Sequence, residues 1–230
     1  MSTALLYKEF RETLPIAVVG LACLLLVALD AMEFSPLPDI FGGRFTGVIP
    51  FIGNDQFLGR YYVAIGAFAI ALGYWHSLGD FWGEAHLFLL HRPISRRSIY
   101  TTKLVIGLSA YLLCAAAPIL LYACWAATPG THASPFDWSM TVRSWTAWLA
   151  AITIYLGAFL SGLRPAAWLG TRLAPLAAAG AILGLAEFLF AAANTFGGGA
   201  LIVLHPLLLL VADFALVAAI LTTADSRDFA

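Results

Sequence analysis

Six long apolar runs dominate this chain and limit what it can fold into. Each has about 18 or more residues with few charges, enough for a helix to cross the roughly 30 Å hydrocarbon core of a bilayer. The runs are continuous, which is typical of membrane helices rather than of barrel strands. The expected spans are 15–32, 61–78, 104–128, 144–163, 173–193 and 200–221. The sequence therefore predicts an all-α polytopic membrane protein with six transmembrane helices in one domain, residues 1–230.

The composition excludes several other classes of protein. Only 11% of the residues are charged and the mean hydropathy is +0.88, whereas soluble domains carry about 25% charged residues. The net charge of −1 gives no general attraction for nucleic acid. Cys23, Cys114 and Cys124 lie inside apolar runs, where their spacing indicates neither a disulfide framework nor a metal site. We therefore expect a lipid bilayer as the surroundings, no nucleic-acid partner and no bound metal.

The basic residues are distributed unevenly among the connections. If the N-terminus lies in the cytoplasm, nine of the twelve Lys and Arg residues fall on the cytoplasmic side, and only Arg44, Arg60 and Arg143 fall outside. Membrane proteins keep an excess of Lys and Arg in their cytoplasmic loops. We therefore expect both termini in the cytoplasm and a multi-pass protein of the cell (inner, cytoplasmic) membrane.

The segment before the first span, residues 1–14, has a helical pattern of its own. Leu6, Phe10 and Leu14 recur every four residues, and charged side chains fill the other face. This pattern predicts an amphipathic interfacial helix lying in the membrane surface, although a frayed polar tail is the alternative. Pro15 is then expected to begin the crossing helix as its first residue.

The connection at 79–103 is the most basic part of the chain and contains "FLLHRPISRRSIYTTKL". Pro93 disfavours helix at Arg92, and Ser95 can cap a new helix that leads into the third span. The stretch therefore predicts a helix–break–helix elbow with exposed basic residues on the cytoplasmic side. A purely topological role, in which the charges only hold the loop inside, remains the alternative.

An acid followed by this string, between the second and third of six spans, resembles the membrane subunit of a type-2 ABC exporter. The architecture covers the whole chain, whereas the motif covers only the turn. In that family the turn forms a coupling helix that docks into a groove of the ATPase subunit. The resemblance, together with apolar anchors in the turn, implies the following coupling residues: Glu84, Phe88, Arg92, Pro93, Ser95, Arg96, Arg97 and Lys103.

The same resemblance implies a permease subunit that works with separate cytosolic ATPase subunits and a second permease, identical or related. Nowhere does the sequence contain a G-x-x-x-x-G-K-[ST] phosphate loop, and its only lysines are Lys8 and Lys103. ATP with Mg²⁺ is therefore expected on the partner subunit, with no cofactor on this chain. We expect a transport subunit without catalytic residues, and the substrate stays open.

Three ionisable residues fall inside predicted spans. Asp213 lies deep in the sixth span, Glu187 in the outer half of the fifth, and His205 near the outer part of the sixth. Such residues are costly in a bilayer and often mark a transport path. We therefore expect Asp213, Glu187 and His205 to line the translocation path; the alternative is a bond from each to a neighbouring helix.

Other classes of membrane protein remain as alternatives. The stretch "GLSA" (107–110) and His205 weakly resemble rhomboid, a six-span intramembrane serine protease, but Ala110 stands where its motif has a second glycine. An anchoring subunit of a membrane complex is also possible.

Small and aromatic residues carry two further predictions about packing. Gly180 and Gly184 form a G-x-x-x-G pattern, for which we expect internal packing and keep a dimer face as the alternative. The expected outer loop, 33–60, is rich in turn residues, but its phenylalanines indicate that it packs on the bundle.

Overall fold

The computed structural model describes residues 3–32, 34, 49–51, 56–82, 95–131, 135–164, 168–196 and 199–226. Within them the chain forms six long helices, a short 3₁₀ turn and no strands. The elements are α1 (Thr3–Ala31), α2 (Gln56–Trp82), α4 (Arg96–Ala127), η1 (Trp138–Thr141), α5 (Val142–Leu163), α6 (Leu169–Phe196) and α7 (Gly199–Ser226). All six α-helices contain a stretch long and apolar enough to cross a membrane. The predicted all-α, six-span fold is confirmed, and the chain is a multi-pass membrane protein.

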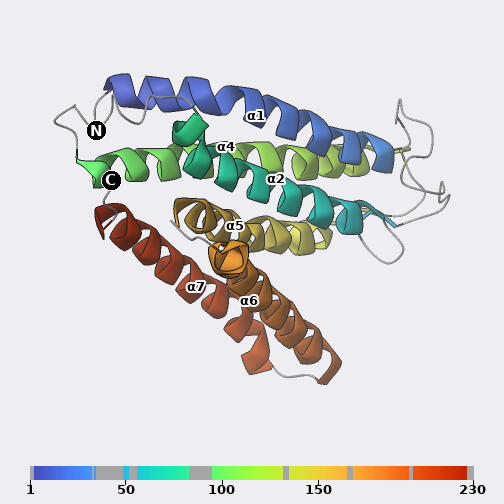
Figure 1. Ribbon diagram of the computed structural model, residues 1–230. Helices are drawn as coiled ribbons and strands as arrows, with labels where there is room; N and C mark the ends of the chain where they lie inside the picture. The colour runs from blue at the N-terminus through green and yellow to red at the C-terminus, as the bar shows by residue number, and fades with distance from the viewer. Residues whose placement is uncertain are drawn as a thin grey trace.

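The helices run alternately in opposite directions along the bundle (Figure 1). Helices α1, α2 and α4 form one layer, α5 packs against α2, and the α6–α7 pair leans away from the others. Helix α1 begins at the end of the bundle where α2 ends, α4 begins and α7 ends. We call this the basic end, because it carries most of the described basic residues: Lys8, Arg11, Arg96, Arg97, Lys103, Arg164 and Arg172.

Helix α5 forms the centre of the bundle because small residues let its neighbours approach closely. A Cβ atom at Gly73 of α2 would lie 2.7 Å from the Tyr155 carbonyl oxygen of α5, and one at Gly157 would lie 2.6 Å from the Ala179 Cβ of α6. By contrast, a Cβ at Gly180 or Gly184 would meet nothing within 4 Å. The internal packing expected for those two glycines is therefore wrong, and both lie on the outer surface of α6.

Helix α1 differs from the predicted surface helix followed by a span. It runs without a break from Thr3 to Ala31, with Pro15 inside it, so the restart expected at Pro15 is wrong and no separate interfacial helix at 1–14 is seen. Proline removes one intrahelical hydrogen bond, a loss that membrane helices tolerate where neighbouring groups compensate. Two polar side chains of the first turns, Glu9 and Thr13, are buried against α2 and α4, which holds this segment in the bundle.

Aromatic side chains close the end of the bundle opposite the basic end. Phe51 is buried, with its ring centroid 5.3 Å from that of Phe57 and 4.7 Å from that of Tyr122 on α4. Phe51 also has a positive φ of 64°, which is uncommon for a residue with a side chain. The predicted packing of the outer loop on the bundle is confirmed for Phe51, and its burial holds the unfavourable backbone conformation in place.

Candidate functional site

The predicted coupling elbow is only partly described. Four of its expected residues, Glu84, Phe88, Arg92 and Pro93, lie outside the described residues. Ser95 caps α4 as predicted, because its hydroxyl accepts a hydrogen bond from the Ser98 backbone N–H at 3.3 Å. Arg96 and Arg97 form the first turn of α4, where the Arg97 side chain is exposed.

Lys103 is the exception among the basic residues of this region, because it is buried rather than exposed. Only 2% of its side chain is accessible, and its Nζ lies 3.8 Å from a carboxylate oxygen of Glu9, which is 1% accessible. The same Nζ donates a hydrogen bond to the backbone carbonyl of His76 at 3.2 Å. One ammonium group therefore joins α1, α2 and α4, and the expectation of an exposed Lys103 is wrong.

A second polar contact joins α1 to α2 beside this lysine. The Thr13 hydroxyl lies 2.8 Å from His76 Nε2 and donates to the Glu9 backbone carbonyl at 2.7 Å. His76 Nδ1 lies 2.9 Å from the Leu72 carbonyl, and because a carbonyl oxygen only accepts, Nδ1 carries a proton. Glu9, Thr13, His76 and Lys103 form what we call the basic-end network.

Contacts at the rim extend this network toward the start of α1. Lys8 pairs with Glu9 at 3.3 Å and with Glu12 at 3.4 Å. The Trp75 indole donates to the Glu12 backbone carbonyl at 3.0 Å. The exposed pair of Lys8 with Glu12 contributes little, about 0–1 kcal/mol, so the buried contacts carry most of the link between α1 and α2.

The first turns of α1 bury two polar side chains and expose several apolar ones. Glu9 and Thr13 are buried, whereas Phe10 and Leu14 are exposed on the outer surface. A soluble helix has the reverse arrangement, since it buries its apolar stripe. The predicted division into an apolar and a charged face is not seen, because Leu5 is buried with Glu9, whereas Arg11 and Glu12 are exposed beside Phe10.

The imidazole of His76 is confined by α4 and α5. A Cβ atom at Gly107 of α4 would lie 2.8 Å from His76 Cε1. The ring of Tyr155 on α5 lies edge-on to the imidazole, with centroids 6.4 Å apart, and its buried hydroxyl has no hydrogen-bond partner among the described residues. These contacts place the His76 ring against α4 and α5 as well as α1.

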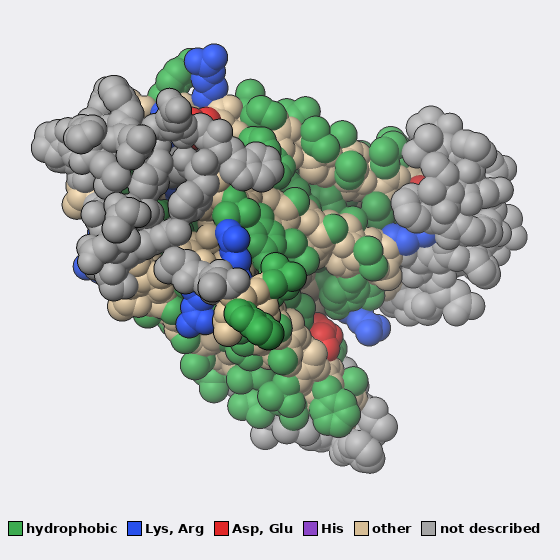
Figure 2. All heavy atoms as spheres, viewed as in Figure 1, with side chains coloured by type: hydrophobic (Ala, Val, Ile, Leu, Met, Phe, Trp, Pro, Cys, Tyr) green, Lys and Arg blue, Asp and Glu red, His purple; other side chains and the backbone are tan. Residues whose placement is uncertain are grey.

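A different polar group lies toward the other end of the bundle. Glu187 of α6 faces His205 of α7, with Oε1 and Nε2 3.7 Å apart. The charges of Glu187 and of Arg143 on α5 both act on the Tyr62 hydroxyl of α2. Tyr62, Arg143, Glu187 and His205 are here called the outer cluster. Figure 2 shows an acidic and a basic side chain on the two sides of the recess between the α6–α7 pair and the upper layer.

The three residues expected along a translocation path are not all together. The outer cluster contains Glu187 and His205, but Asp213 lies about two turns further along α7, a rise of about 12 Å. The Asp213 carboxylate accepts a hydrogen bond from the Thr153 hydroxyl of α5 at 2.7 Å. Asp213 therefore faces the central helix, where Thr153 is fully buried.

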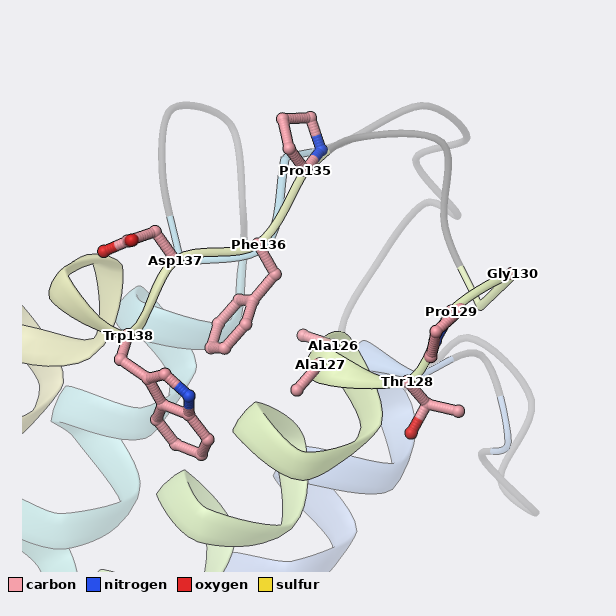
Figure 3. Close-up of a pocket in the computed structure, with 9 residues that line it drawn as sticks. All are labelled: Ala126, Ala127, Thr128, Pro129, Gly130, Pro135, Phe136, Asp137 and Trp138. Atoms are coloured by element: carbon pink, nitrogen blue, oxygen red, sulfur yellow. The ribbon is translucent and has the colours of Figure 1, made fainter.

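A pocket of about 380 Å³ lies at the end of α4 opposite the basic end. It is lined by Ala126, Ala127, Thr128, Pro129, Gly130, Pro135, Phe136, Asp137 and Trp138 (Figure 3). Asp137 caps η1, because its carboxylate accepts from the Ser139 backbone N–H at 2.8 Å. These hydrogen bonds with Ser139 lower the pKa of Asp137. The only ionisable side chain of this pocket thus has a structural task.

Sequence reasoning missed the main members of the basic-end network. Glu9, Thr13 and His76 were not expected to form a site, and the one available signal was an acid among the first turns of a membrane chain. For the protease alternative, Ser109 is exposed on α4 while His205 is buried beside Glu187. Among the described residues, no group of three or more His, Cys, Asp or Glu is placed to hold a metal ion.

Comparison of this chain with models of protein families, with curated proteins and with solved structures finds no match. The residues and their geometry are therefore the whole basis of the functional argument.

Proposed function

We propose that this chain is the permease subunit of an ATP-driven ABC exporter. It forms the translocation path with a second permease, identical or related, and two separate cytosolic ATPase subunits bind ATP with Mg²⁺. The basic end then lies in the cytoplasm, with both chain termini, and the membrane is the cell membrane. The chain itself contributes no catalytic residue. The proposal rests on the resemblance of the stretch at 84–103 to the coupling turn of that family.

The basic-end network is the observation that best supports this proposal. The elbow joins the end of α2 to the start of α4, and both helices are tied to α1 by Lys103, Glu9 and His76. A force applied to the elbow therefore moves α1, α2 and α4 together rather than bending one helix. This is the mechanical property that a coupling turn requires.

Helix α5 offers a route from the elbow to the expected path. Among the described elements, α2 packs most extensively against α5, and α5 in turn contacts both α6 and α7. Closure of the ATPases would push α2, and α5 would pass the displacement to the helices that carry Glu187, His205 and Asp213. The polar groups on α6 and α7 then change their surroundings during each cycle.

The decisive experiment changes the shape of the elbow without changing its charge. Exchange of Pro93 with Ile94, combined with Phe88→Ala, re-aims the turn and removes one apolar anchor. We expect membrane insertion to survive, whereas copurification of the ATPase and substrate-stimulated ATP hydrolysis by the isolated complex should be lost. Trp168→Ala is the matched control, because Trp168 is an exposed aromatic residue at the same end of the bundle.

Two outcomes would contradict the proposal. In the first, the elbow variant assembles and hydrolyses ATP like the parent, which would leave the basic turn as a topology signal only. In the second, a single cysteine at Ser98 in a cysteine-free background reacts with a membrane-impermeant thiol reagent added outside intact cells. That reaction would place the basic end outside the cell.

A further inference from the structure

The contacts around His76 in the basic-end network require one more proton than a neutral histidine supplies. Its Nδ1 lies 2.9 Å from the Leu72 carbonyl oxygen, its Nε2 lies 2.8 Å from the Thr13 hydroxyl oxygen, and that oxygen lies 2.7 Å from the Glu9 carbonyl oxygen. Each contact has the length of a hydrogen bond, so each needs a proton between its two atoms. A neutral imidazole has one N–H and threonine has one O–H, which makes two protons for three contacts.

Every neutral form of His76 leaves two acceptor atoms in short contact. With the proton on Nδ1, the Thr13 hydroxyl can donate either to Nε2 or to the Glu9 carbonyl, and the other pair then repels. With the proton on Nε2, the repulsion moves to Nδ1 and the Leu72 carbonyl. One proton shared between two acceptors would bend at least one bond, and hydrogen bonds weaken steeply when bent. Only the imidazolium, which donates through both nitrogens while Thr13 donates to Glu9, satisfies all three contacts.

The helices packed against α2 bring charges of both signs to this site. The titratable side chains that contact His76 or the rest of the network are Lys8, Glu9 and Glu12 on α1, Lys103 on α4 and Tyr155 on α5. Lys8 and Lys103 balance Glu9 and Glu12, and a tyrosine hydroxyl is neutral in this range of pH. Among the described residues, the imidazolium is therefore held by its hydrogen bonds rather than by a surplus of negative charge.

The burial of this site does not prevent a proton from reaching it. His76 is only 3% accessible, but a bound proton needs no cavity, because it lies on a ring nitrogen that is already in place. Water reaches the rim of the network at Lys8, whose side chain is 30% accessible. The proton is therefore taken from water at the basic end and returned to it, and no other reactant is needed.

We propose that the basic-end network is a proton-binding site, in which a proton on His76 Nε2 joins α1 to α2 and its release loosens the first turns of α1. Histidine is the side chain that ordinarily changes its charge between about pH 5 and 8, so the contact responds to the pH at the basic end. Without the proton, the Thr13 hydroxyl serves either Nε2 or the Glu9 carbonyl, and one hydrogen bond is lost. This inference does not depend on the proposed ATPase coupling, since every contact lies within this chain.

The first measurement determines the charge of the His76 ring directly. The full chain is labelled with ¹⁵N-histidine and studied by NMR in detergent at about pH 6, within the range in which histidine titrates. The His76 signals are those missing from the His76→Gln variant. An imidazolium gives two similar nitrogen shifts, each with a bound hydrogen, whereas a neutral ring gives two widely separated shifts. We expect the imidazolium, and a neutral His76 in the unaltered protein would overturn the proposal, whatever the variants do.

Variants of Thr13 test whether its hydroxyl accepts the bound proton. Thr13→Val removes that acceptor, and the ratio of charged to neutral His76 at the same pH should fall about tenfold, the effect of one hydrogen bond to a charged group. Thr13→Ser keeps the hydroxyl and should keep the ratio. Thr102→Val is the matched control, because Thr102 is also buried but its hydroxyl donates to the Ser98 carbonyl of its own helix. An unchanged ratio in Thr13→Val would overturn the proposed site.

Hydrogen exchange tests whether the proton joins α1 to α2. The opening constant of the backbone amides in the first turns of α1 is measured near pH 6 and near pH 8, after correction for the pH dependence of intrinsic exchange. We expect it to be about tenfold larger near pH 8, because one hydrogen bond to a charged group is lost. In Thr13→Val the constant should be the same at both pH values, and amides of α5 serve as the internal control. Equal opening of α1 at both pH values in the unaltered protein would overturn the proposal.

Discussion

The basic-end network and the outer cluster both place charged groups inside an apolar bundle, but they treat those charges in opposite ways. At the basic end Glu9 and Lys103 are almost fully buried and lie against each other and against further partners. In the outer cluster the His205 and Glu187 atoms stand apart, and the Arg143 charge is unpaired among the described residues. Paired charges stabilise the packing of neighbouring helices, whereas unpaired charges are available to bind a ligand.

The packing of the helices also differs between the basic-end network and the outer cluster. The layer of α1, α2 and α4 closes on α5, with glycines where the backbones approach. The α6–α7 pair leans outward and keeps most of its side chains on the surface (Figure 1). The two regions therefore differ in charge pairing and in helix contacts rather than in exposure alone, since α1 keeps as large a share of its residues on the surface as α7 does. Five variants test this contrast.

Lys103→Met should have the largest effect on stability. It removes the buried one of the two cations that flank the Glu9 carboxylate and leaves only Lys8, which is partly exposed; breaking a buried ion pair costs up to about 3–5 kcal/mol. The free energy of unfolding, measured by titrating the detergent-solubilised protein with a denaturing detergent, should fall accordingly. Lys8→Met is the control, because Lys8 is partly exposed and should cost less than about 1 kcal/mol.

The double variant Glu9→Leu with Lys103→Met sharpens that test. Replacement of both charges by apolar side chains of similar volume leaves no uncompensated ion and should restore much of the lost stability. A double variant as unstable as Lys103→Met alone would show that the lysine acts mainly through His76 rather than through Glu9.

Gly73→Ala should destabilise the contact of α2 with α5. The added methyl group would lie 2.7 Å from a backbone oxygen and 2.9 Å from a backbone nitrogen of α5, neither of which can move aside easily. Such overpacking costs about 1–3 kcal/mol. Gly180→Ala on α6 is the matched control, and it should be neutral or stabilising because its methyl group meets open space. Equal losses in the two variants would contradict the difference in packing.

Thr13→Val keeps the shape of the side chain but removes its hydroxyl. His76 Nε2 then loses its partner on α1, and we expect the free energy of unfolding to fall by about 1–2 kcal/mol. Thr13→Ser restores the hydroxyl and should regain most of this amount. The same denaturing titration decides between the outcomes, and a Thr13→Val protein as stable as the parent would rule out a structural role for this contact.

Arg143→Gln should have the smallest effect on the fold. The side chain is exposed and has no ion-pair partner among the described residues, so its loss should change stability by less than about 0.5 kcal/mol. A loss of stability as large as that of Thr13→Val would mean that the outer cluster also stabilises the fold.

The fold was largely predictable because a bilayer imposes a length and a polarity that a single sequence displays. The six apolar runs identified all six helices, and Ser95 correctly marked the start of α4. The helices are longer than the predicted spans, as at α2, which begins at Gln56 and ends at Trp82. Hydropathy detects the stretch inside the hydrocarbon, whereas backbone hydrogen bonding continues into the polar flanks.

The candidate sites were less predictable because they depend on pairs that are distant in sequence. Glu9 and Lys103 were both read as exposed charges, since nothing local to either residue indicates the other. Likewise Arg143 was noted only for topology, and its electrostatic effect on Tyr62 of α2 depends on the packing of α5 against α2. The residue pattern of one helix predicts which side chains share a face, but the neighbouring helices determine which face is buried.

The tight seam between α2 and α5 also has a consequence for how this sequence can change over evolutionary time. Gly73 and Gly162 accept almost no increase in volume, because backbone or side-chain atoms of the neighbouring helix occupy the space. Outward positions of α6 and α7, such as Leu207 and Phe214, accept any apolar residue. Distant relatives should therefore share the spacing of small residues along this seam long after overall identity is lost, and a search weighted toward that spacing would be the most sensitive way to find them.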